Sequence, residues 1–281
     1  MNEKIPQCVP ADCGLSSSNI LASLPADFPW RGQIHCYASM DSTNTAAKQA
    51  ANNGAEAGTV FIADSQTAGR GRLGRSFLSP AGTGIYLSVV LRPECTPSQL
   101  MHLTCAAAAA VCNAVTQCCG LRPGIKWTND LVAGKRKLAG ILTELSVNSH
   151  TGLVDFVVVG IGINCCQRPE DFPSEIQHIA TSVAIQTGTA VDRSRLCAAV
   201  IMAIYEMQQN LLNKKPQILQ AYRENCITLG QTVSIVGNGT VRYATALDID
   251  EDGGLLVRYD SGETGTVTSG EVSVRGMYGY I

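Results

Sequence analysis

The hydrophobic pattern of the chain changes near residue 228, and this change limits the folds that it can adopt. From residue 30 to residue 228, strand-like and helix-like segments alternate, which predicts a mixed α/β domain. Beyond it, short apolar runs separated by Gly, Asn and Asp turns predict strands at residues 233–236, 241–247, 255–259 and 264–267. Gly253-Gly254 and Ser261-Gly262 are typical of hairpin turns. We therefore expect a small β-barrel over residues 229–281.

The earlier part of the chain has its own element signals. Residues 1–29 follow no sustained period, and we expect an N-terminal extension or a single packed helix there. Within residues 30–228, the pattern predicts helices at 41–53 and 193–212 and strands at 59–63, 85–91, 138–147 and 155–163. The best-marked helix covers residues 96–120, because Thr96, Pro97 and Gln99 stand at the N-cap, N1 and N3 positions of a capping box.

The charge balance argues against a protein whose main task is to hold nucleic acid. The 281 residues include 21 Lys+Arg and 23 Asp+Glu, so no overall basic field attracts phosphates. The first seven residues contain no apolar signal segment, and the longest apolar stretch, around residues 105–112, looks too short to span a bilayer. Several of the twelve cysteines lie in apolar patterns, as small buried hydrophobes do. We therefore expect a cytoplasmic protein without a DNA or membrane partner.

The segment Gly-Arg-Gly-Arg-Leu-Gly-Arg at residues 69–75, here called the arginine loop, carries the strongest local chemical signal. Glycine lets the backbone bend and approach a ligand closely. Arginine offers a planar charged fork that binds phosphate or carboxylate. The loop therefore indicates an anion-binding pocket. An RNA-binding arginine-glycine segment and a solvated surface loop are the alternatives.

Two further segments carry polar groups whose function is open when each is considered alone. Asp41-Ser42-Thr43-Asn44 stands at a predicted helix start, where these residue types favour N-capping and could also contact a ligand. The segment Lys-Trp-Thr-Asn-Asp at residues 126–130 follows a short strand, and is either a strand-end turn or a phosphate and Mg²⁺ site. In strand geometry Lys126, Thr128 and Asp130 would share one face.

Glycines in two predicted strands indicate that something lies against the sheet. Lys137 opens a strand that contains Ala139-Gly140. Gly160 and Gly162 stand near the end of an apolar strand that is followed by Asn164. Glycine weakens a strand interior, so its presence suggests a closely approaching ligand. A bulge, tight packing or, for Lys137, a solvated turn would explain the same residues.

Joined in this order, the segments resemble those of the biotin protein ligase family. The resemblance covers residues 35–281 and adds Gln66 and Gly270-Glu271-Val272-Ser273 to the segments above. It implies an α+β fold, in which a mixed β-sheet is packed with helices as in the class II synthetase-like catalytic domain of biotin and lipoate ligases. The catalytic ligase domain would cover residues 30–228, and an SH3-like β-barrel would cover residues 229–281.

The resemblance implies a two-step reaction. A ligase of this kind joins the biotin carboxylate to the α-phosphate of ATP, giving biotinyl-5′-AMP, and then transfers biotin to one lysine of a biotin carboxyl carrier domain. The first step brings anions together, and each pair of unit charges ~4 Å apart repels by roughly 4 kcal/mol at an effective dielectric constant of ~20. Arginine, lysine and Mg²⁺ must offset this repulsion.

The family pattern assigns roles to individual positions. It implies biotin-binding residues Ser42, Thr43, Asn44, Gln66, Gly69, Arg70, Arg72, Lys137, Gly140, Gly160 and Gly162. It implies ATP-binding residues Arg70, Arg72, Arg75, Phe77, Lys126, Asn129, Asn164 and Arg275. Arg72, Lys137 and Asp130 form the catalytic set, with Asp130 orienting or deprotonating the incoming lysine. Mg²⁺ would bind through Asn129 or Asp130 and the ATP phosphates.

The sequence departs from the family pattern in four places. Phe77 replaces a common tryptophan, Leu73 a common arginine and Thr128 a common proline. The phenyl ring offers less area for stacking on adenine, so the ATP affinity is put in question. Finally, about 30 residues precede the ligase segments, too few for the winged helix-turn-helix of bifunctional members. We expect an enzyme only, as a monomer or a homodimer.

Two other functions are alternatives to a biotin ligase. A lipoate–protein ligase shares the fold but needs a long apolar slot, whereas Ser42, Thr43 and Gln66 favour a ureido ring. A nucleic-acid-binding module would need basic and aromatic residues on one face, and aromatic residues make up only 5% of this chain. We also expect the arginine loop to be mobile when empty, because it lacks apolar anchors.

Overall fold

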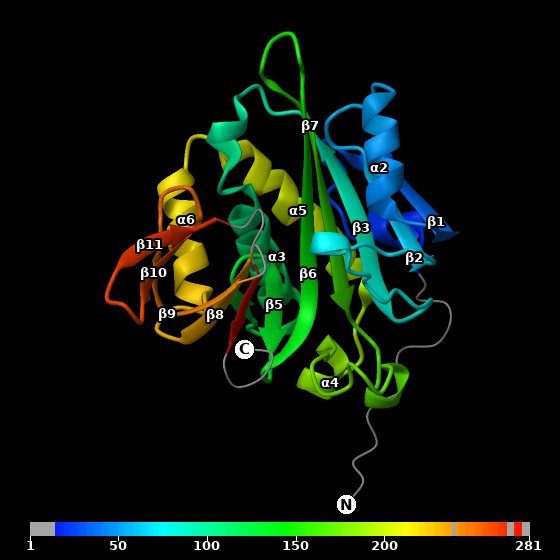
Figure 1. Cartoon of the computed structure of the whole chain (residues 1–281). Helices are drawn as coiled ribbons and strands as arrows, with labels where there is room; N and C mark the ends of the chain where they lie inside the picture. The colour runs from blue at the N-terminus through cyan, green and yellow to red at the C-terminus, as the bar shows by residue number, and fades with distance from the viewer. Residues whose placement is uncertain (1–14, 238–239, 269–272, 277–281) are drawn as a thin grey trace, which may run out of the picture.

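Two β-sheets form the framework of the protein (Figure 1). The computed structural model describes residues 15–237, 240–268 and 273–276. The larger sheet has seven strands in the order β1-β2-β3-β7-β6-β5-β4, and the smaller one has five in the order β11-β10-β9-β8-β12. This arrangement confirms the expected fold class, a mixed sheet packed with helices followed by a small β-domain.

The seven-stranded sheet is antiparallel except at one edge. Its strands are β1 Ile34–Met40, β2 Val60–Gln66, β3 Gly84–Leu91, β4 Gly124–Lys126, β5 Asp130–Ala133, β6 Arg136–Val147 and β7 Val154–Asn164. Only β1 and β2 run parallel. β3 is buried along its whole length, and β7 along most of it. The central strands therefore read as apolar runs, as expected of strands covered on both faces.

The helices divide between the two faces of this sheet. α3 (Leu103–Cys119) and α5 (Arg193–Asn210) pack behind it in Figure 1, with α6 (Lys215–Asn225) beside them, and α2 (Thr43–Asn52) lies in front. The short helices α1 (Ser17–Ala22) and α4 (Val183–Thr187) complete the set. Under α2, Ala47 and Ala51 pack on Val90, Phe156 and Val158. The odd-numbered residues of β7 from 157 to 161 join the core on the other face.

The predicted helix over residues 96–120 is divided in two. The capping box of Thr96 and Gln99 is present, but it starts a 3-10 helix, Pro97–Leu100. α3 begins after His102, whose buried imidazole bonds to the carbonyl oxygen of Leu211, 2.9 Å away. α3 ends at Gly120, which adopts φ 66°.

The apolar helical segment is longer than the sequence predicted. Residues 97–119 form a helical stretch of 23 residues that is long and apolar enough to cross a bilayer, although the alanine tract alone looked too short. In this fold 67% of its most apolar window is buried, against the sheet and the neighbouring helices. It is the central core helix of the domain, and Cys105 and Cys112 are buried within it as predicted.

The described part of the N-terminal region packs onto this core. α1 lies against α5 and buries Ile20. Phe28 and Trp30 both meet Tyr205 edge to face, with ring centroids 5.4 and 5.1 Å apart. Residues 15–30 therefore contribute apolar contacts to the core of the large domain.

The smaller sheet consists of β8 Thr232–Gly237, β9 Thr240–Ile249, β10 Leu255–Tyr259, β11 Thr264–Val267 and β12 Ser273–Gly276. Its first four strands match the sequence prediction, and Gly253 (φ 83°) and Gly262 (φ 87°) form the predicted turns. The turn before β10 docks on the larger domain, where the Trp127 indole nitrogen donates to the Gly253 carbonyl at 2.9 Å. Gly270-Glu271-Val272, part of the family resemblance, lies outside the described residues.

Candidate active site

A small pocket of about 50 Å³ lies on the α2 face of the large sheet, beneath the arginine loop. It gathers residues from segments that are far apart in the sequence. The lining residues are Ser42, Thr43, Asn44, Gln66, Arg70, Gly71, Arg72, Phe77, Asn129, Lys137, Gly140, Ile141, Leu142, Gly160, Ile161 and Gly162. Most of the positions that the sequence singled out therefore meet in one place.

Strand alternation explains why these residues face the pocket. In a β-strand every second side chain points to the same face. Gly140 lies opposite Gly162, Leu142 opposite Gly160 and Glu144 opposite Val158 on neighbouring strands, so one face of β6 and β7 supplies a glycine-rich floor. The missing side chains leave room for residues that approach from above.

At Gly160 and Gly162 of the β7 floor, neighbouring side chains leave no room for a Cβ atom. A Cβ on Gly160 would collide with the side-chain oxygen of Asn44, which enters from α2. A Cβ on Gly162 would lie 2.6 Å from Cε1 of Phe77, which enters from the chain after the arginine loop. The glycines thus admit Asn44 and Phe77 to the sheet surface, as close approach requires.

The start of α2 is both a helix cap and a pocket wall. The Ser42 hydroxyl oxygen is the N-cap acceptor for the Thr45 amide, at 3.4 Å. Gln66 Oε1 accepts from the Thr43 amide at 2.8 Å and from the Thr43 hydroxyl at 3.1 Å. The capping interpretation of this segment is therefore correct, and the same residues line the pocket. A capping serine retains a hydroxyl proton, which it can donate to a ligand.

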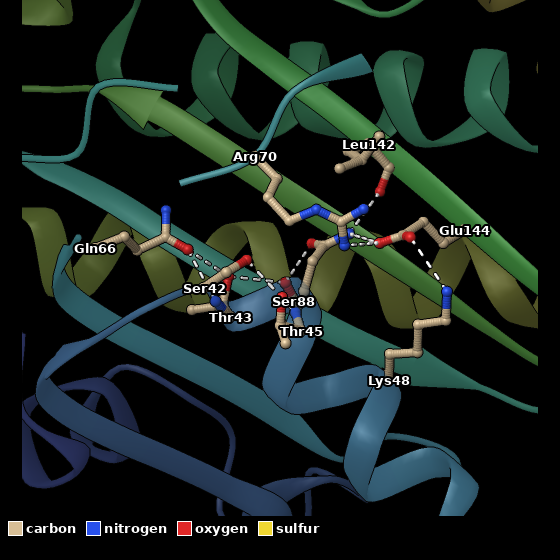
Figure 2. Close-up of polar contacts among 10 residues, drawn as sticks. Ser42, Thr43, Thr45, Lys48, Gln66, Arg70, Ser88, Leu142 and Glu144 are labelled. Carbon is tan, nitrogen blue, oxygen red and sulfur yellow. Dashed lines mark hydrogen bonds and ion pairs between the residues drawn. The ribbon is translucent and has the colours of Figure 1, made fainter. Parts of the chain in front are cut away.

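Ser88 is a residue that the sequence analysis missed. It is fully buried in β3, and its hydroxyl lies 2.8 Å from Thr43 Oγ1 and 2.7 Å from Asn44 Oδ1 (Figure 2). It is a hydroxyl within the apolar run of β3, and buried polar groups need partners. A serine within this apolar run was the sequence feature that could have indicated a buried polar contact.

The arginine loop forms a narrow hairpin above the floor. The Gly71 amide donates to the Arg75 carbonyl at 2.7 Å, and the Phe77 amide donates to the Gly69 carbonyl at 2.9 Å. Gly69 is a required glycine, because a Cβ there would collide with the Phe77 carbonyl. Leu73 at the tip has φ 56°, a left-handed conformation that is uncommon for a leucine.

Two arginines attach this loop to the sheet and the neighbouring turn. Arg70 Nη1 donates to Glu144 Oε2 at 3.0 Å, and Arg72 Nη1 donates to Asn129 Oδ1 at 3.1 Å. Burial lowers the pKa of Arg72, and the nearby carboxylate of Asp130 opposes that effect. Arg72 is thus partly desolvated, which strengthens its attraction for an added anion.

The Lys-Trp-Thr-Asn-Asp segment is a hairpin turn, not an extended strand. β4 ends at Lys126, β5 begins at Asp130, and these two residues pair across the hairpin. The expected extended strand through Thr128 was therefore wrong, whereas Lys126 and Asp130 share one face of the sheet as expected, because they lie directly opposite each other across the hairpin. The turn directs Asn129 toward the pocket, where its Nδ2 donates to the Ile141 carbonyl at 3.0 Å.

Lys137 occupies the centre of the polar side of the pocket. Its ammonium lies 2.7 Å from Asp130 Oδ1 and 5.9 Å from the centre of the Phe77 ring. Asn129 Nδ2 donates to the same Asp130 oxygen at 3.2 Å. A carboxylate, an amide oxygen and two cations therefore meet here, within reach of a bound phosphate. Asp130 and Asn129 carry oxygens of the kind that Mg²⁺ prefers.

Five predicted ligand-binding residues are not part of the pocket lining, and the first of them is Gly69 at the base of the arginine loop. Arg75 is exposed, and Lys126 lies on the far strand of the β4–β5 hairpin. Asn164 is buried, and its amide donates to the Thr181 carbonyl at 2.9 Å, so it holds the chain that follows β7. The backbone of Arg275 belongs to β12, and its side chain lies outside the described residues.

Glu144 is the second residue that sequence analysis missed. It projects from β6 toward α2, where it contacts Arg70, Asn44 and Lys48. Burial tends to raise the pKa of its carboxyl, but the hydrogen bond from Asn44 and the charges of Arg70 and Lys48 outweigh this and lower it. A charged residue within a largely apolar strand was the sequence signal.

Comparison with known proteins agrees with this geometry. Residues 36–164 match the Biotin/lipoate A/B protein ligase family, and residues 228–275 match the Biotin protein ligase C terminal domain. The chain is 35% identical over 249 residues to the biotin--[acetyl-CoA-carboxylase] ligase of Mycobacterium tuberculosis, covering 86% of this chain and 89% of that protein. It is also 35% identical over 225 residues to the bifunctional ligase/repressor BirA of Bacillus subtilis, covering 79% of this chain and 68% of that protein.

A solved structure supports the same relationship. The biotin protein ligase from Aquifex aeolicus in complex with biotin and ATP superposes with a TM-score of 0.74 and 30% sequence identity. The match covers 87% of this chain and 99% of the Aquifex chain. Both domains and the order of the pocket segments are therefore accounted for by one family. The chain belongs to the biotin protein ligase family.

Proposed function

We propose that the pocket forms biotinyl-5′-AMP from biotin and ATP and then transfers biotin to a lysine of a biotin carboxyl carrier domain. The observation that carries the proposal is the convergence of Ser42, Arg72 and Lys137 above a glycine floor. A small polar group can bind at the start of α2, while an anion can bind between the two cations. The relatives named as biotin ligases support biotin over lipoate.

At the start of α2, Ser42 would donate its hydroxyl proton to the ureido carbonyl of biotin. One of its lone pairs accepts from the Thr45 amide, and its proton remains available to a ligand. Gln66 supports this wall through Thr43, and it is itself fixed because its Nε2 donates to Ser79 Oγ at 2.9 Å. The bicyclic ring of biotin would lie on the floor that β6 and β7 provide, beside Asn44 and Phe77.

At the other end, Arg72 and Lys137 would hold the biotin carboxylate next to the α-phosphate. Both reactants are anionic, and cations that are already in place lower the cost of bringing them together. Arg72 is partly buried, and Lys137 is aimed by Asp130. Mg²⁺, bound with the ATP phosphates near Asn129 or Asp130, would neutralise further phosphate charge.

In the transfer step the carrier lysine attacks the acyl carbon and AMP leaves. Arg72 and Lys137 would stabilise the charge that passes onto the phosphate. Asp130 adjoins both cations, so it is the carboxylate positioned to orient the incoming amine. The arginine loop would cover the acyl-adenylate and exclude water until the carrier arrives.

A labelling experiment tests the proposal. The protein is incubated with biotin, Mg-ATP and a biotin carrier domain, and carrier biotinylation is followed with time. We expect labelling by the unmodified protein and a loss of about 100-fold or more in Arg72→Ala, because a donor to the developing charge is removed. Arg195→Ala is the matched control, since Arg195 is an exposed residue of α5 on the opposite side of the sheet.

Each outcome has a distinct meaning. Absence of labelling by the unmodified protein would overturn the assignment. Labelling that depends on lipoate instead of biotin would reassign the substrate. Equal losses in the Arg72 and Arg195 variants would remove Arg72 from the catalytic set.

A further inference from the structure

Glu144 connects three parts of the molecule that surround the pocket. Its Oε2 accepts from Arg70 Nη1 at 3.0 Å and from Asn44 Nδ2 at 3.1 Å, and its Oε1 lies 3.5 Å from Lys48 Nζ (Figure 2). Arg70 belongs to the arginine loop, Asn44 and Lys48 to α2, and Glu144 to β6. One carboxylate thus joins the loop to the helix and the sheet.

The environment of Glu144 favours this contact over a solvated one. Its side chain is 17% exposed, whereas the Arg70 side chain is 45% exposed. The carboxylate is fixed by α2 and by the sheet, and the arginine reaches it from the loop. Glu144 is therefore the stationary partner and Arg70 is the one that can leave.

The size of the pocket makes separation of this pair necessary. The cavity of about 50 Å³ under the loop is far smaller than the roughly 300 Å³ or more that small-molecule sites usually provide. Arg70 lines this cavity and also carries the contact to Glu144. For a bicyclic acid and a nucleotide to enter, the loop must move away from the floor, and the Arg70–Glu144 contact must break.

We propose that Glu144 is a positioning residue that latches the closed arginine loop through Arg70 and so limits the rate at which ligand enters the empty pocket. The inference rests on the proposed function, because the ligand is taken to be biotin and its adenylate. Glu144 does not touch the reacting atoms. Its effect is on opening of the loop, a step distinct from the adenylation chemistry.

Hydrogen exchange of the ligand-free protein tests the latch without any catalytic readout. The amides of Gly71 and Phe77 bond within the loop hairpin, and they report on its opening. We expect Glu144→Gln to speed their exchange by about 3- to 10-fold, the scale of a partly exposed charged contact. Glu170→Gln is the matched control, because it removes the carboxylate of the exposed Arg168–Glu170 ion pair, which is not part of the pocket.

A double-mutant cycle separates the latch from a general loss of stability. Arg70→Gln removes the same contact from the loop side, so the double variant Arg70→Gln/Glu144→Gln should exchange no faster than either single variant. Additive effects of the two substitutions would overturn the proposal. So would an unchanged exchange rate in Glu144→Gln.

The association of biotin with the ligand-free protein gives the functional readout. We expect association with Glu144→Gln to be faster by about the same 3- to 10-fold factor, with pyrophosphate exchange at saturating biotin within about twofold of the unmodified rate. An unchanged association rate in a variant that still forms the adenylate would overturn the latch. If the unmodified protein forms no adenylate, the proposed function fails, and the exchange result still decides whether Glu144 holds the loop.

Discussion

The Lys137 ammonium lies 2.7 Å from a carboxylate oxygen of Asp130, across the hairpin that joins β5 and β6. The pair is not fully exposed, with 29% of the Lys137 side chain and 16% of the Asp130 side chain accessible. Asp130 therefore fixes the position of the cation before any ligand binds. A preorganised cation needs no reorientation when negative charge develops.

This relationship predicts different effects for its two members. Lys137→Met should reduce both adenylation and transfer by about 100-fold or more, because a charge on the reacting phosphate is lost. Asp130→Asn should slow both steps by about tenfold, since the amide cannot hold the ammonium as firmly. Pyrophosphate exchange and transfer from preformed biotinyl-5′-AMP measure the two steps separately. A loss confined to transfer would show that Asp130 acts only by orienting the carrier lysine and not through Lys137.

The two roles of Ser42 can be separated by substitution. Ser42→Ala should lower the free energy of unfolding by about 1 kcal/mol through the lost N-cap, and it should also weaken biotin binding. Ser42→Asp keeps a good capping acceptor but has no proton to donate at neutral pH. We expect it to regain stability in urea unfolding without regaining affinity in biotin titration. Recovery of both together would mean that Ser42 acts only as a cap.

The contact between Gly162 and Phe77 predicts a steric effect on the arginine loop. Gly162→Ala would bring a methyl group to 2.6 Å from the Phe77 ring, so the ring and its loop must move. We expect a loss of about 1–3 kcal/mol in stability and faster release of the adenylate. Gly32→Ala is the control, because a Cβ at Gly32 meets nothing within 4 Å. Adding Phe77→Ala should restore stability, and a failure to do so would place the strain elsewhere.

The lowered pKa of Glu144 predicts how its contribution to stability depends on pH. A carboxyl with a folded-state pKa below its ordinary 4.5 stabilises the folded protein above that value, and the contribution is lost as the pH falls through the folded-state pKa. Glu144→Gln should therefore be less stable than the unmodified protein at pH 7, by at most about 1 kcal/mol for a partly exposed group. The two should converge as the pH falls through the folded-state pKa. Urea unfolding across that range measures this, and a difference that persists in acid would contradict it.

Much of the architecture followed from local patterns. The apolar runs of β3 and β7, the capping box at Thr96 and the turn glycines at 253 and 262 each depend on residues close together in the sequence. Local steric and hydrogen-bonding rules are enough to predict such features. The glycines of β7 also indicated the pocket floor, because their lack of side chains has no use in an ordinary strand.

The parts that escaped prediction depend on tertiary contacts. Glu144 and Ser88 gain their roles only from partners on α2 and in the arginine loop, which are distant in the chain. The hairpin turn before Asp130 interrupts the continuous strand that the periodicity argument assumed. Asn164 follows the strand glycines directly, yet its amide is committed to Thr181. Residue spacing within a single segment cannot predict these contacts, because the partners belong to other segments.

The hydrogen bond from the Trp127 indole to the Gly253 carbonyl joins the turn that carries Asn129 to the small C-terminal sheet. A chain shortened to the large domain would lose this hydrogen bond, worth about 0.5–1.5 kcal/mol, and would expose to water an indole that is only 5% exposed here. That cost would fall on the turn that places Asn129 and Asp130. The small sheet is therefore a structural support of that end of the pocket.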